Sequence, residues 1–237
     1  MDNDLTRRTF LGVAGITAAT AALPAGSTAA AQDSAAPAKP LKIVGIACSP
    51  RQGQSTAAAL AVCLDAARQV DPANIEIELI ELAGKKINGA VAAGVPLAEG
   101  EVDDFPALVP KLADPAVGGI ILATPVYFAN MSSLCKAFLE RWMAFRKDDF
   151  SLANKVAGVL AVGGSRNGGA ELTIQSVQAA LFCQELIVVG ESRPTAHFGP
   201  VAWNQSGQKV TDDEIGMAAV KALGRRVADV ARRVRSC

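Results

Sequence analysis

The sequence predicts a doubly wound α/β fold, with helices on both faces of a five-stranded parallel sheet in the order 2-1-3-4-5. Apolar runs alternate with helical patterns along the chain, as parallel strands joined by right-handed crossovers require. The first run, residues 41–47, is apolar almost throughout, which is typical of a strand covered on both faces. Polar or glycine-rich turns follow three of the runs, at the sheet edge where doubly wound folds bind ligands.

The first half of the chain supplies three strands and two helices. The run Leu41–Ala47 is expected at the centre of the sheet, and a helical pattern follows at Thr56–Val70. Alternating apolar and polar residues at Ile75–Ile80 indicate the second strand. After a loop, we expect a short helix at Asp104–Leu112 and the third strand at the apolar run Gly119–Ala123.

The second half continues the alternation. A longer helix at Ser132–Arg146 leads to the apolar run Lys155–Val162, the fourth strand. A helix is expected at Ala170–Cys183, and Leu186–Val189 completes the sheet. The last helix should begin at Asp212, because basic residues gather near its end and a capping-box pattern stands at its start, in Thr211, Asp212, Asp213 and Glu214.

Length, composition and charge fit one domain at residues 41–237. Half of the 237 residues are hydrophobic, which is enough for one buried α/β core, while the chain is too short for two domains of ordinary size. Lysine plus arginine equals aspartate plus glutamate at 23 each. The balance provides no basic footprint for nucleic acid and no acidic excess for a docking electron carrier.

The turn after the first strand has the composition of a phosphate site. Its hydroxyls, backbone N–H groups and guanidinium can converge on a dianion at a helix N-terminus, where the helix dipole also favours negative charge. A P-loop would need a lysine before its Ser or Thr, and a dinucleotide fold would need G-x-G-x-x-G; neither is present in this turn. An ordinary turn with a Ser or Thr N-cap is the alternative.

Two further turns end the third and fourth strands. Tyr127, the only tyrosine, and Phe128 lie beside Pro125 and Asn130, a set that suits a flat ring system, although Phe128 is equally compatible with the core. Four glycines stand within residues 163–169. They permit either close backbone approach to a ligand or simply a tight turn.

The motifs SPRQGQST, TPVYFANMSSLCKAFLERW and GGSRNGGAE, in this order, resemble the flavodoxin-like NAD(P)H-dependent FMN reductases, and within them the iron-sulfur flavoproteins. The likeness runs from about Lys42 into the last helix. It implies that the FMN phosphate would be surrounded by Ser49, Arg51, Gly53, Ser55 and Thr56. The isoalloxazine and ribityl chain would be lined by Pro125, Tyr127, Phe128, Asn130 and Met131, and the other side of the ring would be closed by Gly163, Gly164, Ser165 and Gly168.

The cysteines depart from this family pattern. Iron-sulfur members carry a compact four-cysteine cluster between the second strand and the second helix, but Asn88–Asp104 contains no cysteine. Since thiolates are the cluster ligands, we expect an ordinary loop there, flavin alone, and no iron-sulfur cluster or other metal. The five cysteines form neither C-x-x-C nor a zinc pattern. Cys48, next to the phosphate turn, is either a buried strand-end thiol or a reactive one.

The resemblance implies an oxidoreductase in which FMN transfers hydride through its N5 atom from NADH or NADPH to a small-molecule acceptor. No catalytic side chain is then needed. An exported flavodoxin-type electron carrier and a flavin-delivery protein are the alternatives. By family analogy we expect a homodimer or homotetramer. The irregular segment Glu191–Gln208 is long enough to fold over a flavin, and its His197 is either an acid/base group or a loop anchor.

The N-terminal segment has the pattern of a twin-arginine export signal. Arg7 and Arg8 lie in TRRTFL, a weakly apolar stretch follows, and an A-x-A site at residues 29–31 predicts cleavage before Gln32. Small residues and Pro24 argue against a permanent membrane span. We therefore expect a signal peptide at 1–31, a tether at 32–40 and a periplasmic protein, which the twin-arginine export machinery moves in folded form after flavin has bound.

Overall fold

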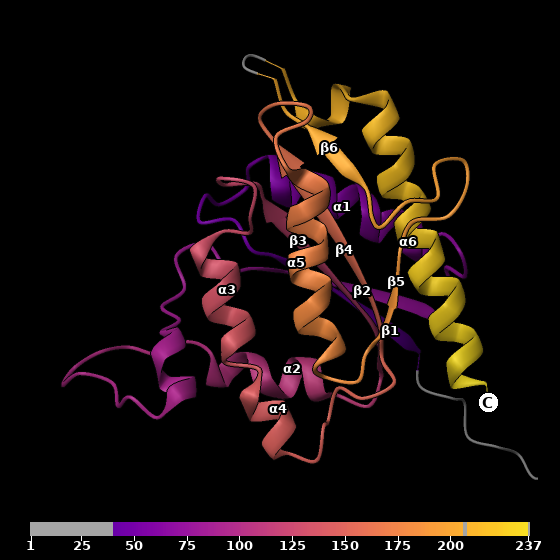
Figure 1. The fold of residues 1–237 in the computed structure, drawn as a ribbon. Coiled ribbons are helices and arrows are strands. Elements are labelled where there is room, and N and C mark those ends of the chain that lie inside the picture. Colours follow the sequence, from indigo (N-terminus) through magenta and orange to yellow (C-terminus); the bar gives the residue numbers. More distant parts are fainter. Residues whose placement is uncertain (1–39, 206–207, 237) are drawn as a thin grey trace, which may run out of the picture. The chain divides into compact units, whose positions relative to one another are not determined.

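The computed structural model describes residues 40–205 and 208–236, so the predicted signal peptide and all of the predicted tether except Pro40 lie outside the described residues. The described chain has an α/β fold, in which helices cover both faces of one β-sheet (Figure 1). Its strands are β1 (Leu41–Ala47), β2 (Ile75–Glu81), β3 (Val117–Pro125), β4 (Val156–Gly163), β5 (Ile187–Val189) and β6 (Val201–Trp203). Its α-helices are α1 (Ser55–Arg68), α2 (Val109–Ala113), α3 (Ser133–Glu140), α4 (Met143–Lys147), α5 (Ala170–Phe182) and α6 (Glu214–Arg235).

The sheet is parallel with the order β2-β1-β3-β4-β5, which confirms the predicted topology. The expectation of five strands was wrong by one. The position beside β4 is shared by two short strands, because β5 pairs with Val156–Gly158 and β6 pairs with Ala161–Gly163. Three residues of β6 are too few for a periodic pattern, so the sequence contained no strand signal there.

The buried strands separate two cores. Side chains of β1 alternate between them: Val44 and Ile46 face the core covered by α3 and α5, while Ile43 and Ala47 face the core covered by α1 and α6. All eight residues of β4 are buried. Burial on both faces explains why these strands are apolar almost without interruption.

Two predicted helices are each divided. Ser132–Arg146 covers α3 and all of α4 except Lys147, and the two helices are separated at Arg141 and Trp142. Phe138, Trp142 and Phe145 keep the i, i+4, i+7 spacing of one helix face, so the pattern carries no mark of the break. Asp104–Leu112 covers the 3-10 helix η2 (Pro106–Leu108) and then all of α2 except Ala113, with a proline in the first turn of each.

The last helix starts two residues later than predicted. Thr211 lies in the 3-10 helix η3 (Val210–Asp212), and α6 begins at Glu214. The cap is Asp213, whose carboxylate accepts the Gly216 N–H at 3.1 Å. The predicted box from Thr211 to Glu214 was wrong because the last of several adjacent capping residues supplies the cap.

The segment between β2 and η2 is a loop with one 3-10 helix, η1 (Gly89–Ala93), and it includes Asn88–Asp104, where this chain lacks the cysteines expected of iron-sulfur members. A bidentate ion pair anchors it: the Arg141 guanidinium contacts the Asp103 carboxylate at 2.9 and 2.7 Å. This guanidinium also holds the pKa of Asp103 below its usual range. In residues 40–205 and 208–236, no helix is long and apolar enough to cross a membrane.

Candidate functional site

The turn between β1 and α1 is the predicted phosphate turn. Ser49 is the second residue after β1 and is buried, and its Oγ accepts the Arg51 N–H at 3.1 Å, which shapes the turn. Arg51 and Gly53 are exposed, and Thr56 is buried at the start of α1. The residue before α1, Gln54, makes no side-chain cap in the described structure. The first N–H groups of a 14-residue helix therefore point toward this turn, as an anion site requires.

The turn after β3 presents its aromatic side chains to solvent. Tyr127 and Asn130 exchange backbone hydrogen bonds of 2.9 and 3.0 Å, and the two residues between them have positive φ. Phe128 is fully exposed, at 105%, so the core alternative for this residue is wrong. Pro125 is buried and Met131 is half-buried against the core.

The glycine turn between β4 and α5 packs on the turn after β3. Gly163 is buried, whereas residues 164–168, with Ser165 and Gly168 among them, are exposed. Gly169 has φ +86°, and a side chain there would collide with Ala129. Glycine is therefore required at position 169 both by backbone conformation and by the neighbouring turn.

Hydrogen bonds hold the three turns at the carboxyl edge of the sheet. Ser132 Oγ donates to the Cys48 carbonyl at 2.6 Å, which joins the end of β1 to the turn after β3. The Val126 N–H donates to the Val162 carbonyl at 3.0 Å, which joins that turn to β4. The structure thus brings together the predicted residues of all three turns. Their contact with a cofactor stays a prediction.

The strand β6 and the residue after it add a fourth wall to the three turns, formed by Trp203 and Asn204. The sequence placed Trp203 only in an irregular segment and gave no signal for Asn204. The Trp203 indole donates to the Gly164 carbonyl at 3.3 Å, and the Arg166 guanidinium lies 4.5 Å from the Trp203 ring centroid. The Asn204 N–H donates to the Gly163 carbonyl, and its side-chain amide donates to Ser55 Oγ at 2.5 Å. The predicted irregular segment Glu191–Gln208 is therefore partly a strand, and its Asn204 contacts the start of α1 beside the phosphate turn.

A second missed residue is Glu81, the last residue of β2. Its Oε2 accepts the Gly53 N–H at 2.8 Å. A carboxylate thus lies beside the turn expected to receive a phosphate. Alternating strand residues are commonly charged, so no pattern distinguished Glu81 from Glu76 or Glu78 in the same strand.

The surroundings of Cys48 and of His197 favour a structural role for each residue. Cys48 is fully buried; burial, then the neighbouring Cys135 thiol, raises its pKa well above the usual value, so the thiol stays protonated. His197 is exposed, and both its backbone N–H and its Nδ1 lie against the buried Glu191 carboxylate, at 2.9 and 3.2 Å. These contacts favour the loop-anchor interpretation of His197.

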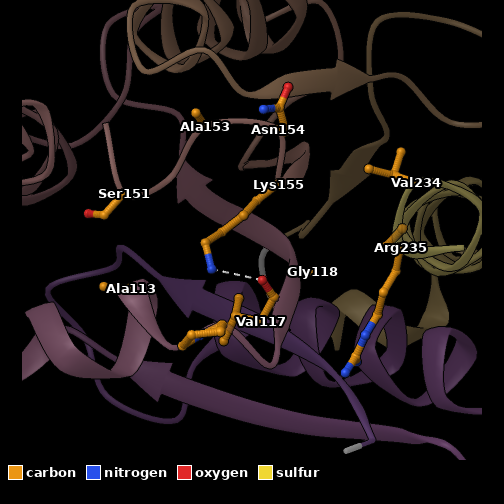
Figure 2. Close-up of a pocket in the computed structure, with 11 residues that line it drawn as sticks. Ala113, Val117, Gly118, Ser151, Ala153, Asn154, Lys155, Val234 and Arg235 are labelled. Atoms are coloured by element: carbon orange, nitrogen blue, oxygen red, sulfur yellow. Dashed lines mark hydrogen bonds between the residues drawn. The ribbon is translucent and has the colours of Figure 1, made fainter. Parts of the chain in front are cut away.

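A separate cavity of about 340 Å³ lies at the opposite end of the sheet, where β3 and β4 begin (Figure 2). Its buried Lys155 donates to the carbonyls of Asp114 and Val117, at 2.8 and 2.9 Å. Burial lowers the pKa of Lys155 to about 8. The cavity is remote from the four walls described above, because parallel strands begin and end at opposite edges of the sheet.

Residues 41–199 match the family described as NADPH-dependent FMN reductase. The chain belongs to this family. An iron-sulfur flavoprotein of Methanocaldococcus jannaschii is 35% identical over 198 residues, which are 82% of this chain and 100% of the relative. An NAD(P)H dehydrogenase (quinone) of Paracoccus denitrificans is 42% identical over 84 residues, 35% of this chain and 39% of that protein. The chain is thus a member of a family of FMN-dependent NAD(P)H oxidoreductases.

A solved structure shares the fold. The crystal structure of RosB with a bound 8-demethyl-8-formylriboflavin-5'-phosphate has a TM-score of 0.62 and 18% identity, and the match covers 83% of this chain and 81% of that chain. At this identity the likeness concerns the fold alone. It agrees with the flavodoxin-like strand order of the sheet.

The residues at the carboxyl edge fit FMN. The phosphate turn offers hydroxyls and a helix N-terminus, and the other turns offer exposed backbone and aromatic surface. In addition, Asn204 Oδ1 is buried there and has no hydrogen-bond partner in the described structure. Residues 88–104 contain no cysteine and so supply no thiolate ligand for an iron-sulfur cluster. Among the described residues, no group of three or more His, Cys, Asp or Glu is placed to hold a metal ion.

Proposed function

We propose that the chain binds FMN at the carboxyl edge of its sheet, among the three turns and the segment Trp203–Asn204, and uses it to carry reducing equivalents from NADH or NADPH to a small acceptor. The observation that carries the proposal is the hydrogen bond from Ser132 to the Cys48 carbonyl. It joins the turns after β1 and β3, between which the strand order reverses. Doubly wound folds bind ligands at this switch point, and flavodoxin binds FMN there.

Each of the three turns would contact a different part of FMN. Ser55, Thr56 and the exposed Arg51 would bind the phosphate with the helix N-terminus of α1. The turn around Tyr127 would support one side of the ring system, and the glycine turn from Gly163 would approach the other side by its backbone. When bound, FMN supplies hydride transfer through N5, so these residues need only bind, orient and shield it.

FMN alone, without an iron-sulfur cluster, is the proposed cofactor content. The absence of cysteine from Asn88–Asp104 and the ion pair that anchors this loop at Asp103 support it. The TRRTFL motif and the A-x-A site support export to the periplasm by the twin-arginine machinery. A homodimer or homotetramer is proposed by analogy with the family.

The test begins with FMN titration of the purified protein, followed by anaerobic reduction with NADH and with NADPH. The reduced protein is then mixed with quinone, free flavin, ferric ion or a nitroaromatic acceptor. We expect tight FMN binding, loss of FMN when Ser55 and Thr56 are both changed to alanine, and rapid multiple turnover with one acceptor class. A wild-type protein that ignores added FMN overturns the proposal. Bound FMN that nicotinamides do not reduce points instead to the electron carrier or the flavin-delivery protein.

A further inference from the structure

Asn204 links two distant parts of the chain at the carboxyl edge of the sheet. It follows β6, and its side-chain amide reaches across to Ser55 at the start of α1, 149 residues earlier in the chain. The Nδ2 to Oγ distance is 2.5 Å. A loop residue that comes from the far end of the sheet thus contacts the turn proposed to bind the FMN phosphate.

The contact with Ser55 controls where the Ser55 proton points. A serine hydroxyl has one proton to donate and lone pairs to accept with. Because Asn204 Nδ2 already donates to Ser55 Oγ, the hydroxyl has to direct its own proton to another acceptor. A phosphate oxygen in the turn would be such an acceptor, and a hydrogen bond to a charged oxygen is a strong one.

The other end of the amide lacks a partner. Asn204 Oδ1 is buried and accepts no hydrogen bond within the described residues. Buried side-chain polar atoms are nearly always paired in native structures, so an unpaired carbonyl oxygen indicates a donor that the described residues do not supply. The ribityl hydroxyls of FMN are donors of the required kind.

The backbone around Asn204 is held firmly from two sides. Its own N–H donates to the Gly163 carbonyl at 2.9 Å. The preceding residue, Trp203, donates its N–H to the Asp213 carboxylate at 2.8 Å and its indole N–H to the Gly164 carbonyl. The side-chain amide is therefore fixed between the phosphate turn and the glycine turn before any ligand arrives, which lowers the cost of ordering it on binding.

We propose that Asn204 is a positioning and binding residue for the phosphoribityl part of FMN. Its Nδ2 orients the Ser55 hydroxyl toward the phosphate, and its Oδ1 accepts a hydrogen bond from a ribityl hydroxyl. This inference rests on the proposed function, and it adds a residue outside the three turns that the sequence identified.

The experiment measures dissociation constants of FMN and riboflavin, by flavin fluorescence, for the full chain and its variants Asn204→Asp, Asn204→Ala, Ser55→Ala and Asn204→Ala/Ser55→Ala. Asn204→Asp keeps the shape but removes the donor and adds a negative charge. We expect it to weaken FMN binding by more than about tenfold and riboflavin binding by much less. The ³¹P resonance of bound FMN should also shift, since the Ser55 hydroxyl loses its orientation.

The alanine variants separate the two contacts. Asn204→Ala should weaken riboflavin binding about fivefold through the lost ribityl contact, and FMN binding by a further factor of about five or more. In the Ser55→Ala background, Asn204→Ala should cost FMN only what it costs riboflavin, because there is no hydroxyl left to orient. Gln69→Ala, an exposed amide at the opposite end of α1, is the matched control and should leave both constants unchanged.

Two results would overturn the inference while leaving the proposed function intact. One is FMN binding at wild-type strength in both Asn204 variants. The other is an equal loss for FMN and riboflavin that adds to the effect of Ser55→Ala, which would show that Asn204 only supports the fourth wall. Failure of the wild-type protein to bind FMN is a separate result, and it overturns the proposed function and this inference together.

Discussion

Glu81 is the residue whose charge most directly opposes the proposed cofactor. Its carboxylate accepts the Gly53 N–H at 2.8 Å, beside a turn expected to hold a phosphate dianion. Changing Glu81 to Gln keeps a carbonyl oxygen for this N–H but removes the repulsion. We expect Glu81→Gln to bind FMN about three- to tenfold more tightly at low salt, with less gain at high salt and none for riboflavin. Weaker FMN binding in titrations of this variant would show that the carboxylate is needed to shape the turn.

The buried Lys155 should make the free energy of unfolding depend on pH, and a comparison with Lys155→Met isolates its contribution. Burial lowers its pKa to about 8 from about 10.5, so between these values the unfolded lysine holds a proton that the folded one has lost. Stability contributed at this site therefore rises with pH across that window. Urea denaturation should show wild type gaining a few kcal/mol relative to Lys155→Met between pH 8 and pH 10.5.

The comparison with Lys155→Met is needed because a buried thiol acts in the opposite sense. Burial raises the pKa of Cys63 from 9 to about 12, so above pH 9 the folded state keeps a proton that the unfolded state loses, and stability falls. Because wild type and Lys155→Met both contain Cys63, the contribution of this thiol cancels when their free energies of unfolding are subtracted. The exposed Lys221→Met is the control and should track wild type. A constant difference between wild type and Lys155→Met would refute the expected pKa.

Among the elements, the turn between β4 and α5 depends on Gly169. A methyl group there would strike Ala129, and φ +86° is itself unfavourable for alanine. We expect Gly169→Ala to lower the free energy of unfolding by about 1–3 kcal/mol and to weaken FMN binding, since the turns after β3 and β4 would separate. Gly164→Ala is the stability control, because nothing lies within 4 Å of its added methyl. Equal urea midpoints for the two variants would contradict the packing described for Gly169.

Elements differ in how far the sequence could predict them. Strands β1, β3 and β4 were found within two residues because burial on both faces makes them continuously apolar. The three turns proposed to bind FMN could be located in the sequence because each comes at the end of one of those strands. In contrast, β6 has three residues, and Asn204 and Glu81 reach their partners over 149 and 28 residues. Such contacts depend on how the sheet is assembled, and no local pattern reports them.

At the scale of the whole molecule, the proposed FMN site exists only when the chain is fully folded. Ser55 stands near the start of the domain and Asn204 near its end, and they meet because β6 pairs with β4. FMN can therefore be held only by the assembled sheet. A protein that is exported already folded would carry its flavin with it, whereas one exported as an unfolded chain would have to load FMN outside the cytoplasm.

The TRRTFL motif connects this folding requirement to the route of export, because twin-arginine export moves folded proteins. We expect wild type to be recovered from the periplasm with FMN bound and its N-terminus at Gln32. The variant Arg7→Lys/Arg8→Lys should stay in the cytoplasm, uncleaved and equally yellow, since the substitutions lie outside the domain that would hold FMN. Cell fractionation, N-terminal sequencing and flavin absorbance measure the three properties. Periplasmic recovery of the double-lysine variant would contradict twin-arginine export, and a wild-type protein that reaches the periplasm without flavin would contradict loading before export.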